Sequence, residues 1–519
     1  MHRVPGLEDI ESVAASMGLM MAREDTVIYQ KHIGRLLGGF DTFLQERHDE
    51  TIPPRFPGAR SPGSRPSRSE DPHNAWMWKC HIEGSGSGLL AGKTVSYKDH
   101  TAVAGMPQTF GAYALEGFVP DYDATIVSRA LEAGATVVGK NVMNGLAGGF
   151  GFGGASGDYE RPLNPHNPDH LTGGSSSGSA VALALGEVDI SFGGDQGGSI
   201  RIPAAWSGTI GLKPTFGLVS HFGAGFGSDQ SIDYVGPMAM TVENCSLALD
   251  AVAGYDGLDP RQGRAVPDSY DSLSTLGDGI AGLRIGVVDE GYLGATEAVT
   301  DSVTAAINTL AALGAIVTRV SIPLHLKAGA AQAALSAEGS LAVRQTGFYG
   351  AFAKTYYPAD TIAAINRVWE SQPETLDHRG TLNALAGVYS KRYFGGRTYA
   401  KAQNSRTGFV AAYDSALADV DILVMPTTIT QAPLFEPPVG REQILEQALL
   451  GSAVTKAVNN TLPFNFTGHP ALALPTEKRG GLPVSIQLVG RMFEDNLLLR
   501  VAQAYTEAVP FADYLAIES

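Results

Sequence analysis

Two glycine-rich loops in the first half of the chain carry serines in a setting that suits hydrolysis. The first loop spans residues 173–179 (GGSSSGS) and the second spans residues 194–201 (GDQGGSIR). A serine hydroxyl can attack a carbonyl carbon, and glycines allow backbone N–H groups to approach the oxyanion that then develops. These residue types indicate nucleophilic chemistry at a serine.

The second loop has the pattern of an oxyanion hole. It follows an apolar run at residues 188–192, which predicts a strand that ends where the glycines begin. Consecutive backbone amides can then turn toward one point beside a hydroxyl, and glycines keep side chains away from the substrate carbonyl. The predicted donors are the N–H groups of Gln196, Gly197, Gly198 and Ser199.

Two charged residues, Asp195 and Arg201, bracket this loop. We expect an ion pair between them that fixes the shape of the loop, because a loop that binds an oxyanion must be preorganised. An ordinary surface pair, which contributes little to stability, is the alternative.

A serine nucleophile needs a base, and Lys98 is the main candidate. It ends an apolar, strand-like run at residues 94–97, where burial would lower its pKa and populate the neutral amine. A solvated lysine at a strand end is the alternative. None of the twelve histidines has a recognisable catalytic setting, although His100 is a minor candidate because it is close to Lys98.

In combination these residues resemble the amidase signature family, whose mark is a Ser-cisSer-Lys triad. The family's spacing is kept, since Ser175 and Ser199 are 24 residues apart. The similarity runs from about residue 85 to the C-terminus. Further stretches that resemble the family are residues 211–215 (GLKPT), 233–238 (DYVGPM) and 481–487 (GLPVSIQ).

The resemblance implies a role for each of these residues. Ser199 would be the nucleophile that accepts the acyl group, Ser175 would follow a cis Gly174–Ser175 bond and carry the proton onward, and Lys98 would be the base. Ser176 would be a supporting hydrogen-bond partner. The reaction would be the hydrolysis of an amide C–N bond through an acyl-enzyme, without a cofactor or a metal.

Within the family the chain looks most similar to bacterial amidases that accept aliphatic and aromatic carboxamides. Those enzymes pair through N-terminal helices, so the resemblance also implies a homodimer. One stretch departs from such relatives: they commonly carry an acidic residue after a Gly-Lys-Xaa motif, whereas this chain has Asn144 and Gly145 after Gly139-Lys140. Anilides, carbamates and esters therefore stay open beside simple carboxamides.

We expect an acyl or aryl pocket next to the serines, and core packing is the alternative for its aromatic residues. The residues expected to line it are Phe150, Phe152, Gly174 and Trp206.

Three other kinds of protein are alternatives to this family. Residues 174–178 fit the G-x-S-x-G elbow of an α/β-hydrolase, which would make Ser176 the nucleophile. Residues 86–94 come near a phosphate-binding loop, but its spacing fails. A metal hydrolase is disfavoured, because the sequence has neither an H-E-x-x-H motif nor a compact His/Asp cluster.

The elements that must position these loops alternate between strands and helices. Residues 283–288 predict a strand, residues 296–313 a helix and residues 316–320 a second strand. Such alternation predicts an α/β fold with a large, mostly parallel mixed sheet that helices cover on both faces. We place an N-terminal helical extension and linker at residues 1–70 and a catalytic domain at residues 71–519.

Composition limits the partners and the setting of the protein. The 519 residues carry a formal charge of −16, which argues against a nucleic-acid or anionic membrane partner. This charge does not affect the binding of a small neutral amide. The two cysteines, Cys80 and Cys245, have no metal-type spacing and suit a reducing compartment. With no signal peptide and no long apolar run, we expect a cytoplasmic protein.

Overall fold

The chain forms two compact units in a computed structural model, Met1–Ile52 and Pro53–Ser519. The structure describes residues 4–56, 58–147, 158–350, 353–371, 378–437, 439–448 and 455–510.

The N-terminal unit is helical, as the sequence predicts for the N-terminal extension, and contains the helices α1 (Leu7–Ser16) and α2 (Arg23–Gln45). Ile10 and Ala14 of α1 are buried, and the Arg23 guanidinium donates to Glu11 Oε1 at 2.8 Å. Many other apolar side chains of both helices are exposed within this unit.

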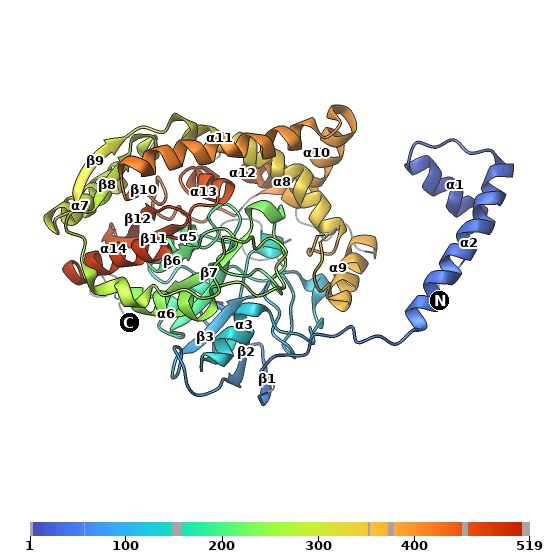
Figure 1. Ribbon diagram of the computed structural model, residues 1–519, viewed down its shortest axis with the longest axis horizontal. Helices are drawn as coiled ribbons and strands as arrows, with labels where there is room; N and C mark the ends of the chain where they lie inside the picture. The colour runs from blue at the N-terminus through green and yellow to red at the C-terminus, as the bar shows by residue number, and fades with distance from the viewer. Residues whose placement is uncertain are drawn as a thin grey trace. The chain divides into compact units, whose positions relative to one another are not determined.

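The larger unit is built on a twelve-stranded sheet with the order β1-β2-β4-β3-β5-β7-β6-β11-β12-β10-β8-β9 (Figure 1). The strands are β1 (Arg60–Ser64), β2 (Trp76–Glu83), β3 (Thr94–Lys98), β4 (Thr136–Asn141), β5 (Ile190–Asp195), β6 (Ile210–Lys213), β7 (Tyr234–Ala239), β8 (Arg284–Val288), β9 (Ile316–Val320), β10 (Ile422–Pro426), β11 (Ala471–Arg479) and β12 (Leu482–Val489).

The sheet is mixed, and its parallel part is smaller than the sequence predicts. Among the described strands, β3 pairs in parallel with β4 and β5, and β8 pairs in parallel with β9 and β10. The other seven neighbouring pairs are antiparallel. The mixed α/β sheet is confirmed, but the expected parallel majority is wrong, because hairpins such as β11–β12 and long-range pairs such as β6–β11 outnumber the β-α-β crossovers.

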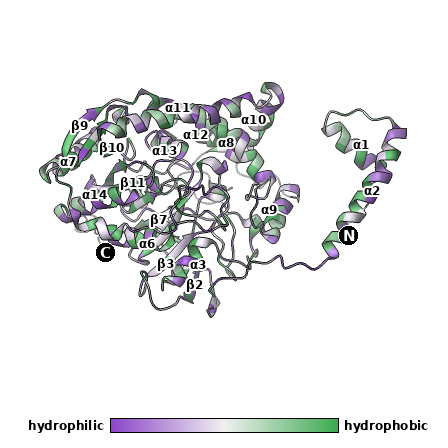
Figure 2. Ribbon diagram, in the orientation of Figure 1, coloured by the Kyte–Doolittle hydropathy of each residue, from purple (hydrophilic) through white to green (hydrophobic). Residues whose placement is uncertain are grey.

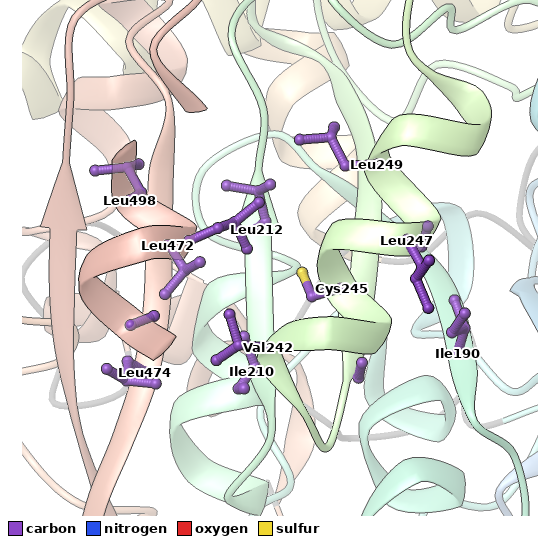
Figure 3. Close-up of a cluster of buried hydrophobic side chains, with 14 of the residues drawn as sticks. Ile190, Ile210, Leu212, Val242, Cys245, Leu247, Leu249, Leu472, Leu474 and Leu498 are labelled. Atoms are coloured by element: carbon purple, nitrogen blue, oxygen red, sulfur yellow. The ribbon is translucent and has the colours of Figure 1, made fainter. Parts of the chain in front are cut away.

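Helices cover both faces of this sheet, as predicted. Alternate residues of β10 show the two faces, because Ile422 and Val424 pack in one apolar cluster and Leu423 and Met425 in another. Figure 3 shows part of the first cluster, where Cys245 of α6 packs near Leu212 of β6. The helices on this face are α3 (Thr125–Glu132), α6 (Val242–Val252), α7 (Glu297–Ala312) and α14 (Asp495–Ala508).

On the opposite face, α4 (Ser177–Ala184), α5 (Arg201–Ser207) and α11 (Arg397–Asp419) contribute buried side chains. Hydrophilic and hydrophobic residues alternate along outer helices such as α7 and α11 (Figure 2), as expected for helices with one face against a core. The remaining helices are α8 (Ala328–Gln345), α9 (Ala359–Ser371), α10 (His378–Phe394), α12 (Gly440–Ala448) and α13 (Leu462–Thr467).

The segment that the sequence predicts as a linker contains an element of the large unit. Residues 60–64 form strand β1, which pairs with β2 at one edge of the sheet. The division of the chain at residue 70 stays a prediction. No helix in the described ranges is long and apolar enough to cross a membrane.

Candidate active site

Lys98 and Ser175 meet in the interior of the larger unit. Lys98 is the last residue of β3, and Ser175 lies in the loop before α4. The Lys98 Nζ donates to Ser175 Oγ at 2.7 Å and to the Gly194 carbonyl oxygen at 3.3 Å. The Gly174–Ser175 peptide bond is cis, as the resemblance implied. Both side chains are fully buried, so the sequence-predicted pair is in direct contact.

The surroundings of Lys98 favour its neutral form. Burial lowers the pKa of Lys98 to about 8, although the negative charges of Asp233 and Asp195 act in the opposite direction. A buried ammonium loses hydration, and this loss outweighs the attraction of the two carboxylates. The neutral amine is therefore accessible near physiological pH.

The loop that carries Ser199 is held by its carbonyl groups. Each backbone carbonyl oxygen from residue 195 to residue 199 accepts a hydrogen bond from a donor outside residues 194–201. The pairs are Asp195 O with Asn465 Nδ2 (2.8 Å), Gln196 O with Gln332 Nε2 (2.5 Å), Gly197 O with Thr461 Oγ1 (2.6 Å), Gly198 O with Ile202 N (2.7 Å) and Ser199 O with Ser176 N (3.2 Å).

The backbone N–H groups of the same loop differ in whether they have a hydrogen-bond acceptor. Within the described part of the chain, the N–H groups of Gln196, Gly197 and Ser199 have no acceptor. The Gly198 N–H, which the sequence assigned to the oxyanion hole, donates instead to Asp195 Oδ1 at 2.7 Å. Gly198 has φ of 134°, and a Cβ there would lie 2.4 Å from Thr461 Oγ1, so this position requires glycine.

The two serine loops are joined at Ser176. Its hydroxyl donates to the Gly194 carbonyl oxygen and accepts from the Gly194 N–H, both at 3.2 Å. Ser176 is fully buried, whereas Ser199 is half-buried. No hydrogen bond of the Ser199 hydroxyl occurs among the described residues. Ser176 thus has the surroundings of a supporting residue, and Ser199 has the more accessible hydroxyl.

Asp195 and Arg201 form the ion pair that the sequence predicts, and both are fully buried. The guanidinium contacts the carboxylate through two N–H groups, at 3.0 and 3.1 Å. Burial opposes ionisation of Asp195, but the Arg201 charge and several hydrogen bonds outweigh it and hold the pKa at about 2. The pair is therefore an internal clamp rather than a surface contact.

Arg201 connects this clamp to the C-terminal part of the chain. Its remaining N–H groups donate to Thr461 O at 2.7 Å, Gln487 Oε1 at 2.8 Å and Asn465 Oδ1 at 2.6 Å. Sequence reasoning did not connect these partners with the loop, because they lie more than 250 residues from it and Thr461 and Asn465 belong to no recognised motif. Only the GLPVSIQ stretch, which contains Gln487, gave a signal.

The comparisons with known proteins agree with this geometry. A family model described as Amidase matches residues 72–499. The chain belongs to the amidase family. An enantioselective amidase of Rhodococcus rhodochrous is 39% identical over 86% of this chain and 85% of the relative. A glutamyl-tRNA(Gln) amidotransferase subunit from Exiguobacterium sibiricum is 37% identical over 80% of this chain and 84% of the relative.

A solved structure has the same fold. The corresponding glutamyl-tRNA(Gln) amidotransferase subunit from Thermotoga maritima superposes with a TM-score of 0.66 at 27% identity, covering 84% of this chain and 89% of that one. Family membership makes this chain an enzyme that hydrolyses amide C–N bonds.

A second polar cluster lies beside the amidase site. Asp233 Oδ1 accepts from Gln196 Nε2 at 2.6 Å and from His221 Nε2 at 3.1 Å. His100 is buried next to this cluster, and burial and the Lys98 charge hold its pKa well below the ordinary value. A Cβ on Gly194 would lie 2.4 Å from His100 Nε2, so that nitrogen packs against the Gly194 backbone, and it makes no hydrogen bond among the described residues.

The four residues predicted to line the substrate pocket differ in where they lie. Phe150 and Phe152 lie outside the described residues. Gly174 is buried at the cis bond beside Ser175. Trp206 is buried in an apolar cluster with Leu171 and Ile202, and its Nε1 donates to Thr428 Oγ1 at 3.2 Å. Its surroundings match core packing, the alternative that the sequence left open.

The described ranges contain no cluster of side chains that could hold a metal ion. No group of three His, Cys, Asp or Glu side chains there is close enough to bind one. The acidic and basic side chains at this site pair with one another instead, as the Asp195–Arg201 clamp illustrates.

We predict that Arg201→Met destabilises the protein strongly. It would leave the Asp195 carboxylate buried and unpaired, and breaking a buried pair in this way costs about 3–5 kcal/mol. Urea denaturation followed by circular dichroism measures the free energy of unfolding. Arg284→Met is the matched control, because Arg284 pairs with Asp421 while 45% exposed, and such pairs contribute about 1 kcal/mol or less. Equal losses in the two variants would contradict the clamp.

Proposed function

We propose that the protein is a serine amidohydrolase that cleaves small carboxamides through an acyl-enzyme on Ser199. The observation that carries this proposal is the 2.7 Å contact between Lys98 Nζ and Ser175 Oγ, which places a buried amine of lowered pKa beside a serine. In this proposal the half-buried Ser199 is the nucleophile, and the fixed loop around it supplies the oxyanion hole. This arrangement needs no other base.

In the proposed reaction the neutral Lys98 amine accepts the Ser175 proton while Ser175 accepts the Ser199 proton. The Ser199 oxygen attacks the amide carbonyl, and the N–H groups of Gln196, Gly197 and Ser199 donate to the oxyanion. The proton returns along the same path to the leaving nitrogen as the C–N bond breaks. Water then attacks the ester of Ser199 and releases the acid, with Lys98 again acting as the base.

Simple aliphatic and aromatic carboxamides are the proposed substrates. The relative named an enantioselective amidase supports this class. Anilides, carbamates and esters are alternatives with the same triad. Glutamine is a second candidate, because other relatives are named as parts of a glutamyl-tRNA(Gln) amidotransferase.

The proposal is tested by measuring how the unmodified enzyme and three variants turn over a panel of substrates. Turnover of benzamide, an acyl anilide, ethyl carbamate, a matched ester and glutamine is measured by the release of ammonia, amine or acid. We expect benzamide to be cleaved with the highest kcat/KM. Ser199→Ala and Lys98→Met should each lower it by at least about 10²-fold, because general-base catalysis alone contributes about 10²–10⁴.

Ser176→Ala separates the proposed site from an α/β-hydrolase site. It should leave Ser199 turnover measurable, because Ser176 contacts the Gly194 backbone rather than Lys98. If Ser176→Ala were inactive while Lys98→Met kept full activity, the proposed triad would be wrong. A preference for glutamine, whose side chain is itself a primary carboxamide, would replace simple uncharged carboxamides such as benzamide as the substrate class.

The pH dependence of kcat/KM should follow the titration of Lys98. The amine must be neutral to act as a base, so activity should rise with pH through an apparent pKa of about 8 and level off above it. Asp233→Asn should move this limb to lower pH, because the Asp233 charge raises the pKa of Lys98. Asp301→Asn, an exposed change on α7, should leave it unmoved. A flat profile from pH about 6 to about 10 would exclude Lys98 as the base.

We also propose a homodimer joined through the N-terminal extension, residues 1–70, in a cytoplasmic protein. The exposed apolar residues of α1 and α2 support it, and they include Val13, Val27, Ile28, Phe40, Phe43 and Leu44. Sedimentation velocity should give a dimer, and the double change Phe40→Glu with Phe43→Glu should give a monomer. Phe394→Glu, at an exposed position of α10, is the control. A monomeric unmodified protein would refute the proposal.

A further inference from the structure

Helix α8 contacts the nucleophile loop through the side chain of Gln332. Its Nε2 donates to the Gln196 carbonyl oxygen at 2.5 Å, and the residue is 7% exposed. A Cβ built on Gly197 would lie 3.6 Å from the same nitrogen, so Gln332 packs directly against the Gln196–Gly197 peptide. No motif in the sequence marks α8 as part of the site.

This hydrogen bond controls the direction of a neighbouring amide. The Gln196 carbonyl and the Gly197 N–H belong to one planar peptide group, in which they point in opposite directions. Holding the carbonyl oxygen therefore fixes the direction of the N–H. Gly197 has no side chain to limit rotation about this peptide, so an external partner is needed to keep it in one orientation.

Gln332 acts on the loop independently of the Asp195–Arg201 clamp. Asn465 holds the Asp195 carbonyl and also contacts Arg201, and the Thr461 backbone accepts from Arg201 as well. Within the described residues, Gln332 makes no hydrogen bond to Asp195 or Arg201. A change at Gln332 can therefore loosen one peptide while the ion pair stays intact.

We infer that Gln332 is a positioning residue for catalysis, which holds the Gly197 N–H toward the oxyanion of the reacting amide. The inference rests on the proposed function, in which that N–H is a donor of the oxyanion hole. An oxyanion forms fully only in the tetrahedral transition state, so the contribution of Gln332 belongs to turnover rather than to substrate binding.

Two substitutions remove the donated hydrogen bond in different ways. Gln332→Leu removes the donor, and Gln332→Glu keeps the shape while placing a carboxylate oxygen against the carbonyl oxygen. Loss of a direct oxyanion donor costs about 10²–10³ in kcat, so we expect a smaller loss of about 10- to 100-fold for a residue that acts through one donor. KM should change by less than about threefold, since ground-state contacts are kept.

The experiment measures kcat and KM for benzamide in both variants, together with two inhibition constants. A boronic acid that forms a tetrahedral adduct with Ser199 reports transition-state binding, and the product benzoate reports ground-state binding. Boronic acid affinity should fall by the same factor as kcat/KM, and benzoate affinity should stay unchanged. Gln345→Leu is the matched control, because Gln345 is an exposed residue of the same helix.

The outcomes separate this inference from the proposed function. If Ser199→Ala is inactive and both Gln332 variants keep kcat within about twofold of the unmodified enzyme, the positioning role is wrong and the triad stands. If both inhibitors and the melting temperature change together, Gln332 is structural only and the inference is again overturned. Full turnover of Ser199→Ala would instead refute the proposed function. Because Gln332→Glu places a charge in a buried position, Gln332→Leu decides the matter if the glutamate variant fails to fold.

Discussion

The buried ion pair of Asp195 and Arg201 is the interaction on which the site depends. Removing two charges from water is unfavourable, and it is tolerated only where every donor and acceptor of the pair is satisfied. Arg201 meets this condition by donating to the 461–465 segment and to Gln487 of β12. The same hydrogen bonds tie the loop that carries Ser199 to strands and helices far along the chain. The shape of the loop is therefore a property of the whole catalytic unit.

Lys98 is governed by a balance between burial and charge. Burial alone would depress its pKa further, and the nearby carboxylates of Asp233 and Asp195 limit that depression. These carboxylates also accept hydrogen bonds from the loop, Asp195 from the Gly198 N–H and Asp233 from Gln196 Nε2. The groups that shape the loop thus also set the protonation of the amine, which couples geometry to acid–base chemistry at one place.

Parallel strands explain why these groups meet. β3 and β5 are parallel neighbours, with Tyr97 opposite Phe192, so Lys98 and Asp195 both lie at the carboxyl ends of adjacent strands. Side chains that follow such ends gather at one edge of a sheet, and open α/β sheets commonly bind ligands there. The antiparallel β7 on the other side of β5 brings Asp233 to the same edge, just before Tyr234, which is opposite Asp195.

The sequence by itself determined the local elements and the candidate residues of the site. The β8-α7-β9 unit, the glycine-rich loop around Ser199 and the Asp195–Arg201 pair follow from short-range patterns, because periodicity and glycine spacing act over a few residues. The role of Ser175 came instead from the resemblance to the amidase signature family, which also favoured Lys98 as the base. Only the tertiary structure decided which strands pair, that Gly198 donates to Asp195 while its neighbours stay open, and that Thr461, Asn465 and Gln332 hold the loop. The contacts of Thr461, Asn465 and Gln332 with the loop each join residues more than 100 positions apart in the chain. Contacts over such distances depend on packing of the whole sheet, which local residue patterns do not encode.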